Sequence, residues 1–303
     1  MTSVLVVGSV AFDDIETPFG LAHDTLGGSA TYFSLAASTY GTVNLVAVVG
    51  EDFPARHVGT LQEKGVDTSG LQVREGKTFR WAGRYEYDLN TAHTLDTQLN
   101  VFADFHPHLP ERYRDSGFVF LANIDPELQI EVLSQVPRAK LRVMDTMNFW
   151  IERRREHLTK AISLVDIVLM NEAEVRQFAG TYSLVAAARQ VLALGPKALV
   201  VKKGEYGAVL FADSGYFAAP AYPLEEVKDP TGAGDSFAGG FVGYLSSVSE
   251  ITDDAIRRAI VHGSVIASFT VEDFGVGRLV SLTSEEVSVR YREIRRFTYC
   301  EDV

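Results

Sequence analysis

The chain has 303 residues, 46% of them hydrophobic, and a formal net charge of −12 at pH 7. An acidic surface of this kind argues against nucleic acid and anionic membranes as partners. No apolar stretch approaches the ~20 residues that span a bilayer, and the apolar start of the chain lacks the basic flank of a secretory signal. The one cysteine, Cys300, cannot form an internal disulfide, which fits a reducing compartment. We therefore expect a globular, cytoplasmic protein.

The first predicted element is a buried parallel strand at 3–9, a short β-branched run. Asp13 and Asp14 follow it and would lie near the carboxyl end of the strand, where open α/β sheets bind ligands. An acid at such a place can also belong to a solvated loop. The segment from Gly8 to Asp13 lacks the second and third glycines of a dinucleotide-binding turn, which argues against a dinucleotide enzyme.

A glycine pair, Gly27 and Gly28, precedes the next predicted helix. This helix is expected from Ala30 to Tyr40, with Gly41 as its C-cap. A glycine pair at a helix start allows a ligand to approach the backbone closely, although a plain loop has the same composition.

A second buried strand is predicted at 44–50 and a helix from there to about residue 64, the alternation of a parallel doubly wound sheet. Residues 78–89 break this rhythm, because aromatic residues alternate there with polar ones, as in an exposed sheet. With a polar turn at 90–96 and a strand at 98–102, they predict an antiparallel insertion at roughly 77–103. An edge hairpin of the main sheet is the alternative. The pattern does not tell which of four side chains face a ligand: Arg80, Trp81, Arg84 and Tyr85.

Three further buried strands are predicted, at 118–122, 141–145 and 166–170. Asp145 ends the second of them, and Asn171 follows the third. Polar groups at successive strand ends line one edge of the sheet, where a polyhydroxy ligand would lie. Asn171 can equally be the N-cap of a helix with Glu174 in its first turn, and the two interpretations are compatible.

A strand at 198–202 ends in two lysines, Lys202 and Lys203, before Gly204. Lysine is a point-charge ligand for phosphate, although the end of a surface strand is the simpler explanation. Farther on, a helix is predicted from 251 to 269, and a capping box at 283–286 begins the last helix. Arginines in that helix are expected to form a solvated face: 290, 292, 295 and 296.

The stretch 229–236 contains a Gly-Ala-Gly turn that leads directly into an apolar helix. Its glycines leave backbone N–H groups uncovered, and the helix start adds unpaired N–H groups and the positive end of a dipole. Such a concavity binds anions, most often phosphate. Asp235, at the junction, can take a proton from a hydroxyl that attacks phosphorus. The alternative is a tight turn in which Asp235 only caps the helix.

This stretch resembles the C-terminal signature of the ribokinase-like (PfkB) family of carbohydrate and nucleoside kinases, Asp-Thr-x-Gly-Ala-Gly-Asp, with Pro230 in place of the usual Thr. The glycine pair, the antiparallel insertion and the Asn-x-x-Glu motif occur at the family's spacing, so the resemblance covers essentially the whole chain. It implies a three-layer αβα sandwich around a mostly parallel, doubly wound sheet. It also implies one domain, 1–303, in which the insertion at 77–103 is a small β lid over the acceptor.

The activity that the resemblance implies is ATP-dependent transfer of the γ-phosphoryl group to a hydroxyl of a small sugar or polyol. Asp235 would be the base, and the amides of Gly232, Ala233 and Gly234 would form the anion hole. Asn171 and Glu174 would position Mg²⁺, largely through water. The expected acceptor contacts are Asp13, Gly27, Gly28, Tyr32 and Asp145. The expected nucleotide contacts are Asn171, Glu174, Lys203, Gly204, His262 and Gly275.

Two departures from the family pattern leave alternatives open. Tyr32 stands where sugar kinases commonly have Asn, and an aromatic ring there could stack on a base, so a nucleoside kinase is the alternative. A non-catalytic ligand-binding protein with the same fold is a second alternative. Pro230 weakens the expectation of K⁺ beside Asp229. Because some family members pair through their lids, a homodimer is also expected.

Overall fold

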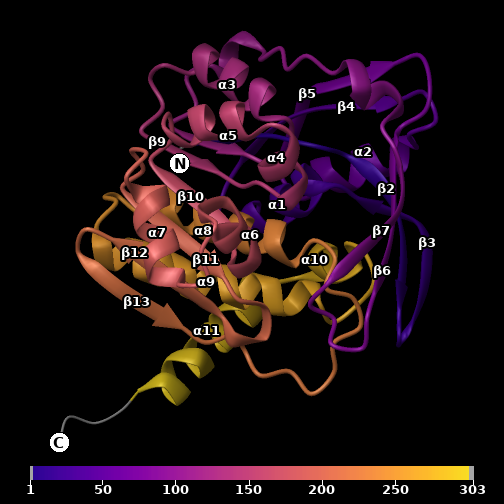
Figure 1. Cartoon of the computed structure of the whole chain (residues 1–303). Coiled ribbons are helices and arrows are strands. Elements are labelled where there is room, and N and C mark those ends of the chain that lie inside the picture. The colour runs from indigo at the N-terminus through magenta and orange to yellow at the C-terminus, as the bar shows by residue number, and fades with distance from the viewer. Residues whose placement is uncertain (1–2, 300–303) are drawn as a thin grey trace, which may run out of the picture.

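The computed structural model describes residues 3–299, so Cys300 lies outside the described residues. The main sheet has nine strands in the order β13-β12-β11-β10-β9-β8-β1-β4-β5 (Figure 1). All neighbouring strands pair in parallel except β11 with β12 and β12 with β13. The strands are β1 (Val4–Val7), β4 (Val43–Gly50), β5 (Val66–Arg74), β8 (Phe118–Leu121), β9 (Leu141–Met144), β10 (Ile167–Asn171), β11 (Ala198–Lys202), β12 (Ala208–Ala212) and β13 (Gly215–Ala219). The predicted doubly wound sheet is confirmed.

Alternate residues of the central strands enter two separate cores. In β1, Val4 and Val6 belong to one core, and Leu5 and Val7 belong to the other. Burial on both faces explains why these strands read as continuous apolar runs rather than as an alternation. The order reverses between β1 and β8, so the crevice for a ligand is expected at the carboxyl ends of these two strands.

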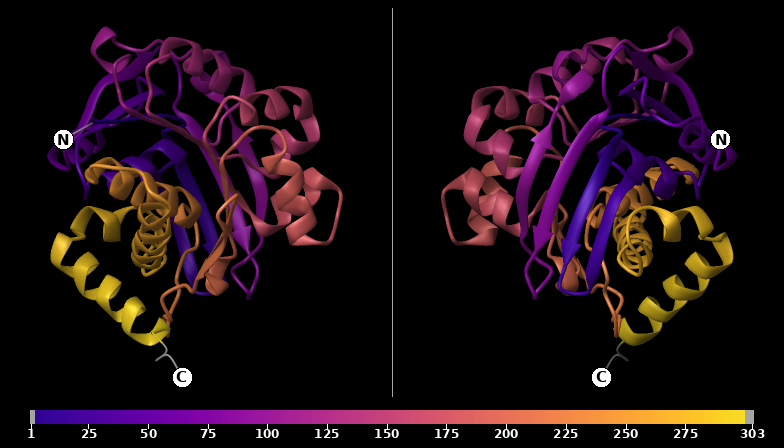
Figure 2. Two further views of the ribbon diagram at one scale, coloured as in Figure 1. Left: turned by 90° about the vertical axis from the view of Figure 1, so that its left-hand side faces the viewer. Right: turned by 90° about the vertical axis from the view of Figure 1, so that its right-hand side faces the viewer.

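Helices cover both faces of the sheet, which gives the predicted three layers (Figure 2). The first face is covered by α1 (Ser29–Ala37), α2 (Ala55–Glu63), α8 (Ala233–Ser247), α9 (Asp253–Thr270), α10 (Gly277–Ser281) and α11 (Ser284–Thr298). The second face is covered by α3 (Pro126–Gln135), α4 (Asn148–Arg153), α5 (Arg155–Ile162), α6 (Glu172–Ala179) and α7 (Leu184–Leu192). None of the helices within residues 3–299 is long and apolar enough to cross a membrane.

Glycines bring α8 close to α1. A Cβ on Gly239 would lie 2.5 Å from both the Cβ of Ala36 and the carbonyl oxygen of Phe33, so a side chain there would push the helices apart. Phe33 in turn stacks on Phe120 of β8, with ring centroids 4.2 Å apart. This packing fixes where α8 begins relative to the central strands.

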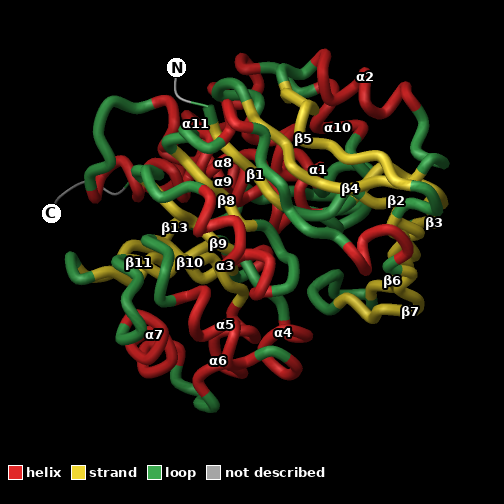
Figure 3. Tube along the Cα trace, turned by 90° about the horizontal axis from the view of Figure 1, so that it is seen from above, coloured by secondary structure: helices red, strands yellow, loops and turns green. Residues whose placement is uncertain are grey.

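A second sheet has four strands in the order β3-β2-β6-β7 and lies to one side of the main sheet (Figure 3). They are β2 (Ala11–Thr17), β3 (Gly20–Gly27), β6 (Phe79–Tyr85) and β7 (Ala92–Gln98). The expected insertion at 77–103 holds only β6 and β7. The strands β2 and β3 come from residues 11–27, where no strand was predicted, because paired acids hide the alternation of β2. We call this four-stranded sheet the lid.

Several local expectations were wrong. The lid turn is shorter than expected, because β7 already begins at Ala92. The strand expected at 98–102 is also wrong, because β7 ends at Gln98 and residues 100–102 belong to a 3₁₀ helix, η1 (Asn100–Asp104). Helix α1 ends at Ala37, so Gly41 is not its cap. Strand β5 was not predicted at all, because polar residues interrupt its apolar positions.

The expected solvated arginine face of the last helix is also partly wrong. The guanidinium of Arg290 lies 3.6 Å from the ring centroid of Phe269 and donates a hydrogen bond to Glu272. Its side chain is therefore buried between α11 and α9, and it stabilises their contact.

Candidate active site

The Gly-Ala-Gly turn forms the first turn of α8, and its shape depends on glycine. Gly232 is the N-cap residue, with a φ of 73°, and a Cβ there would lie 2.3 Å from the ring of Tyr32. A Cβ on Gly234 would lie 3.1 Å from the Nζ atom of Lys202. The amide of Ala233 donates to the carbonyl of Pro230 at 3.1 Å, so this one of the three amides is engaged in the turn.

Asp235 follows in the first turn of α8, without a side-chain cap at Gly232. The residue is partly exposed at the mouth of the site, but protein closely surrounds its carboxylate. Burial and the neighbouring charge of Asp145 raise its pKa to about 7, against the opposing effect of Lys202. A carboxylate with such a pKa is suited to general-base catalysis near neutral pH.

Asp13 belongs to the lid strand β2 and lies in the same site. Burial raises its pKa to about 7; the Gly28 amide opposes this shift, and the charges of Asp229 and Asp235 add to it. A Cβ on Gly27 would lie 1.9 Å from the Oδ2 atom of Asp13, so only glycine leaves room for this carboxylate. Gly28 has a φ of 93° and turns the chain into α1. The glycine pair thus positions Asp13, and its direct contact with a ligand stays a prediction.

The register of the lid identifies its inward face. Asp13 pairs with Trp81 across the β2–β6 ladder, and residues paired in this way point to the same face. On that face Trp81 covers Gly83, and the Tyr85 hydroxyl accepts a hydrogen bond from the Oγ1 atom of Thr231 at 3.2 Å. The lid is therefore closed onto the Gly-Ala-Gly turn.

The two arginines of β6 point the other way. Arg80 pairs with Asp24, and Arg84 pairs with Glu16 at 2.7 Å. The sequence pattern had left open which of the four candidate side chains face inward, and the structure selects Trp81 and Tyr85.

Tyr32 cannot stack on a ligand in this structure. Its side chain is wholly buried beneath Gly232, and its hydroxyl has no hydrogen-bond partner among the described residues. Burial is the main cause that raises the pKa of the Tyr32 hydroxyl, and the charges of Asp13 and Asp229 raise it further. The expectation of an aromatic platform at this position is wrong, because the ring instead supports the turn from below.

A charge cluster that the sequence did not reveal lies beside Asp235. The Nζ atom of Lys202 contacts the Oδ2 atom of Asp145 at 2.5 Å, and both side chains are largely buried. The Oδ1 atom of Asp145 accepts the amide of Thr146 at 2.9 Å. Asp145 is therefore paired with Lys202, and its direct contact with an acceptor hydroxyl stays a prediction. The signal for Lys202 was its place at a strand end, but Lys203 follows directly and has the same signal.

Asn171 and Glu174 form a capping box at the start of α6. The Glu174 carboxylate accepts the amide of Asn171, and the Asn171 side chain accepts the amide of Glu174 at 2.8 Å. Burial raises the pKa of Glu174 to about 7, with Lys202 opposing the shift and Asp145 adding to it. No three acidic, histidine or cysteine side chains within residues 3–299 lie close enough together to hold a metal ion unaided. Binding of Mg²⁺ at this pair through water stays a prediction that fits the donors.

The remaining expected nucleotide contacts lie in different surroundings. Lys203 reaches Glu172 at 3.5 Å, and Gly204, with a φ of 55°, lies against Asn90 at the tip of the lid. His262, by contrast, is stacked between Tyr244 and Tyr291. Its Nδ1 atom lies 2.9 Å from the Tyr40 hydroxyl, and burial lowers its pKa to about 4. Its ring packs between helices, and its contact with a nucleotide has no support in this geometry.

Asp229 ties two loops together. Its Oδ1 atom accepts the amide of Thr231 at 2.8 Å, and its Oδ2 atom accepts the amide of Gly275 at 3.2 Å. Burial raises its pKa, although these hydrogen bonds oppose the shift. Both oxygens thus have a structural task, and K⁺ near Asp229 stays a prediction.

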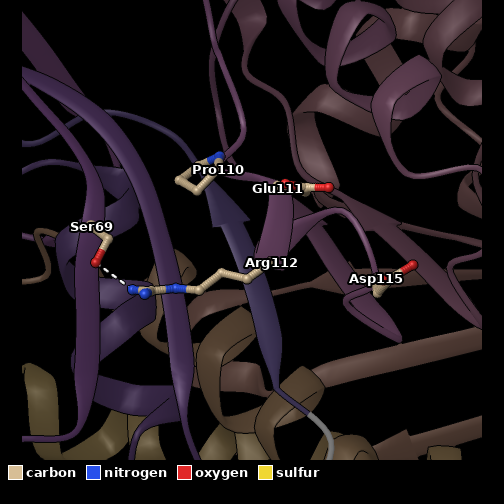
Figure 4. A pocket seen from close by; sticks show the side chains of 5 residues that line it. All are labelled: Ser69, Pro110, Glu111, Arg112 and Asp115. Atoms are coloured by element: carbon tan, nitrogen blue, oxygen red, sulfur yellow. Dashed lines mark hydrogen bonds between the residues drawn. The ribbon is translucent and has the colours of Figure 1, made fainter.

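A surface depression elsewhere is lined by Ser69, Pro110, Glu111, Arg112 and Asp115 (Figure 4). Arg112 donates there to Ser69 and to Asp67, so its charge is already paired. The depression lies beside β5, at the edge of the sheet, and includes none of the residues described above.

Comparisons with known proteins agree with this fold. A model of the pfkB family of carbohydrate kinases matches residues 1–282. A cytidine kinase from Thermococcus kodakarensis is 33% identical over 250 residues, which cover 80% of this chain and 89% of that protein. An inositol 3-kinase from Arabidopsis thaliana is 25% identical over 282 residues, which cover 90% and 74%. A putative ribokinase II from E. coli, solved with ATP and Mg²⁺, has the same fold, with a TM-score of 0.78, 19% identity and coverage of 97% and 100%.

The fold, the closed lid and the Gly-Ala-Gly turn with its acid thus occur together in a chain that the family model matches over most of its length. The protein belongs to the pfkB family of carbohydrate kinases and is an ATP-dependent phosphotransferase whose acceptor is a hydroxyl of a sugar or nucleoside.

Proposed function

We propose that Asp235 is the base of this transfer. It accepts the proton of the acceptor hydroxyl while the oxygen of that hydroxyl forms a bond to the γ-phosphorus of ATP. The bond from phosphorus to the β,γ-bridging oxygen breaks, and ADP leaves with the electron pair. The observation that supports this role is a buried carboxylate with a raised pKa in the first turn of α8, directly beside the glycine turn.

The glycine turn and the Asn171–Glu174 pair complete the proposal. The N-terminal end of α8 supplies N–H groups and a positive dipole end to the phosphate oxygens. When bound, Mg²⁺ neutralises phosphate charge and orients the phosphates. Glu174 would hold it through water, because each carboxylate oxygen has one N–H donor and can still accept from a metal-bound water.

We further propose that the acceptor is a nucleoside. Asp13 offers a carboxylate for sugar hydroxyls, and Trp81 offers an aromatic face beside it on the inward side of the lid. A free sugar or polyol needs no such platform, whereas a base gains ~1–3 kcal/mol from aromatic stacking. The similarity to a cytidine kinase supports this choice. A polyol stays the second candidate, because an inositol 3-kinase is also similar.

The outer surface of the lid suggests a homodimer. Strand β7 is an exposed edge, and the lid and its turns have large exposed apolar side chains, among them Phe19, Leu21 and Leu95. An unpaired edge with apolar side chains favours pairing with another copy of the chain.

The base is tested by Asp235→Asn. Asn keeps the size of the side chain but cannot accept the proton, so kcat should fall by ~10²–10⁴-fold with ATP affinity and thermal stability close to wild type. In the wild type, kcat/KM should fall as the pH decreases through about 7, because Asp235 then takes up a proton. As a control, Asp253→Asn changes an exposed acid in the first turn of α9 and should leave turnover intact. Substantial turnover by Asp235→Asn would mean that Asp235 only shapes the helix start.

The acceptor carboxylate is tested by Asp13→Asn through activity and stability together. Because burial raises the pKa of Asp13 to about 7, the folded state keeps a proton that the unfolded chain releases from about pH 4 upward. Its ionisation therefore costs stability as the pH rises, and the cost is complete above pH 7. Asp13→Asn should raise the free energy of unfolding by ~4 kcal/mol at about pH 8, by about half as much or less at about pH 5, and hardly at all at about pH 3.

The same variant should raise the KM for the acceptor and leave the KM for ATP nearly unchanged. Asp14→Asn is the matched control, since Asp14 neighbours Asp13 but is half-exposed on the other face of β2. Equal changes in both KM values would remove Asp13 from the acceptor site.

The nucleoside proposal is tested with a panel of cytidine, adenosine, inosine, ribose and myo-inositol, and with Trp81→Leu. Loss of the ring should raise the KM for a nucleoside by ~10–100-fold, the worth of one stacked base. Arg84→Leu, on the outer face of the same strand, should leave that KM unchanged. If the protein phosphorylates myo-inositol or ribose and none of the nucleosides, the acceptor is not a nucleoside and the second candidate is correct.

The dimer is tested by sedimentation at micromolar concentration. We expect a species of twice the chain mass of 33.3 kDa, and a monomer for Leu95→Lys, because a charge on the edge strand opposes pairing. Val289→Lys places the same charge on the exposed face of α11 and should not change the mass. A wild-type monomer would refute the proposal.

A further inference from the structure

The ammonium of Lys202 lies over the glycine turn rather than at the protein surface. Along β11, Ala198 and Val200 enter the core that lies beneath α8, whereas Leu199 and Val201 enter the opposite one. Since strand side chains alternate, Lys202 points to the α8 side. A Cβ on Gly234 would lie 3.1 Å from its Nζ, 3.8 Å from its Cε and 4.0 Å from its Cδ, so the whole tail of the lysine runs along this glycine.

The surroundings of this ammonium are acidic. Asp145 is in direct contact, and the charges of Glu174 and Asp235 also act on it. Burial alone would lower the pKa of Lys202, but these carboxylates outweigh burial and raise it, so the side chain is cationic. A lysine ammonium has three N–H donors, and Asp145 accepts one of them. The others can donate to an anion above the turn.

We propose that Lys202 is a catalytic residue, which binds the non-bridging oxygens of the transferred phosphoryl group above Gly234 while Asp145 holds it in place. No covalent bond to Lys202 forms or breaks; it remains protonated throughout and acts on the charge that develops on the phosphoryl oxygens. Asp145 is a positioning residue in this scheme. The proposal depends on the phosphoryl transfer and not on which acceptor is used.

The competing explanation is that Lys202 is only the counter-ion of the buried Asp145. Removing one partner of such a pair leaves an uncompensated charge, so Lys202→Met alone could unfold the protein for this reason. The double variant Lys202→Met/Asp145→Asn removes both charges and leaves a neutral pair of similar size. The double variant therefore gives the decisive measurement, once circular dichroism and thermal unfolding have verified its fold.

The double variant should have a kcat ~10²–10³-fold below wild type, the usual effect of removing one donor that stabilises a transition state. With Mg²⁺ present, calorimetry should show that it binds a non-hydrolysable ATP analogue ~10-fold more weakly while binding ADP nearly as well as wild type, because the lost contact is to the γ-phosphoryl group. Lys197→Met, at the opposite, exposed end of β11, should keep wild-type values in both measurements.

Two results would overturn the proposal. If the folded double variant turns over at the wild-type rate, Lys202 serves only to neutralise Asp145. If the affinities for ADP and for the ATP analogue fall by the same factor, Lys202 does not contact the γ-phosphoryl group. Both measurements use whichever acceptor the wild type phosphorylates, so they remain decisive even if the acceptor is not a nucleoside.

Discussion

The site depends on an imbalance of buried charge. Asp145, Glu174 and Asp235 surround one ammonium, that of Lys202, in a region with little access to water. Burying three carboxylates beside one ammonium is unfavourable unless carboxylates take up protons. The pKa values of Asp235 and Glu174 are raised for this reason. Because negative charge is in excess, the site favours the binding of cations and the uptake of protons. Binding of a metal ion with phosphate, and transfer of a proton to Asp235, both fit that condition.

Glycine allows this density of polar groups without cavities. At Gly27 the missing Cβ leaves the space that the Asp13 carboxylate fills, and at Gly232 it leaves the space above the ring of Tyr32. Asp13, from the lid sheet, and the turn that begins helix α8 thereby approach each other. An alanine at Gly27 would force the Asp13 carboxylate to move, and one at Gly232 would force the ring of Tyr32 to move. Close packing, rather than flexibility, therefore requires glycine at these two positions.

In the function proposed above, the lid joins acceptor binding to closure, because one strand takes part in both. Strand β2 contains Asp13 and also pairs with β6, whose inward face presents Trp81 and Tyr85. The hydrogen bond from Thr231 to Tyr85 then connects the lid to the loop that leads into α8. An acceptor held by Asp13 is therefore covered by the same sheet that touches the phosphate end of the site. Such covering excludes water, which would otherwise compete as a phosphoryl acceptor.

The sequence by itself determined the layered α/β fold, because strands buried on both faces must be continuous apolar runs and their helices must follow them. It also determined the glycine turn, since local backbone chemistry defines Gly232, Gly234 and the start of α8. Only the tertiary structure decided what depends on contacts between distant segments. The lid needed β2 and β3, and the paired acids of β2 hide its alternation. The inward face of the lid follows from cross-strand register.

In the same way, the burial of Tyr32 beneath Gly232 joins positions 200 residues apart in the chain, and no local pattern contains it. The partnership of Lys202 with Asp145 joins two strand ends separated by 57 residues. From the sequence, Asp145 read as a ligand for hydroxyl groups and Lys202 as one of two equivalent lysines. Side chains alternate along β11 between the two faces of the sheet, and α8 covers one of these faces. Lys202 therefore points into the site, where Asp145 is its partner.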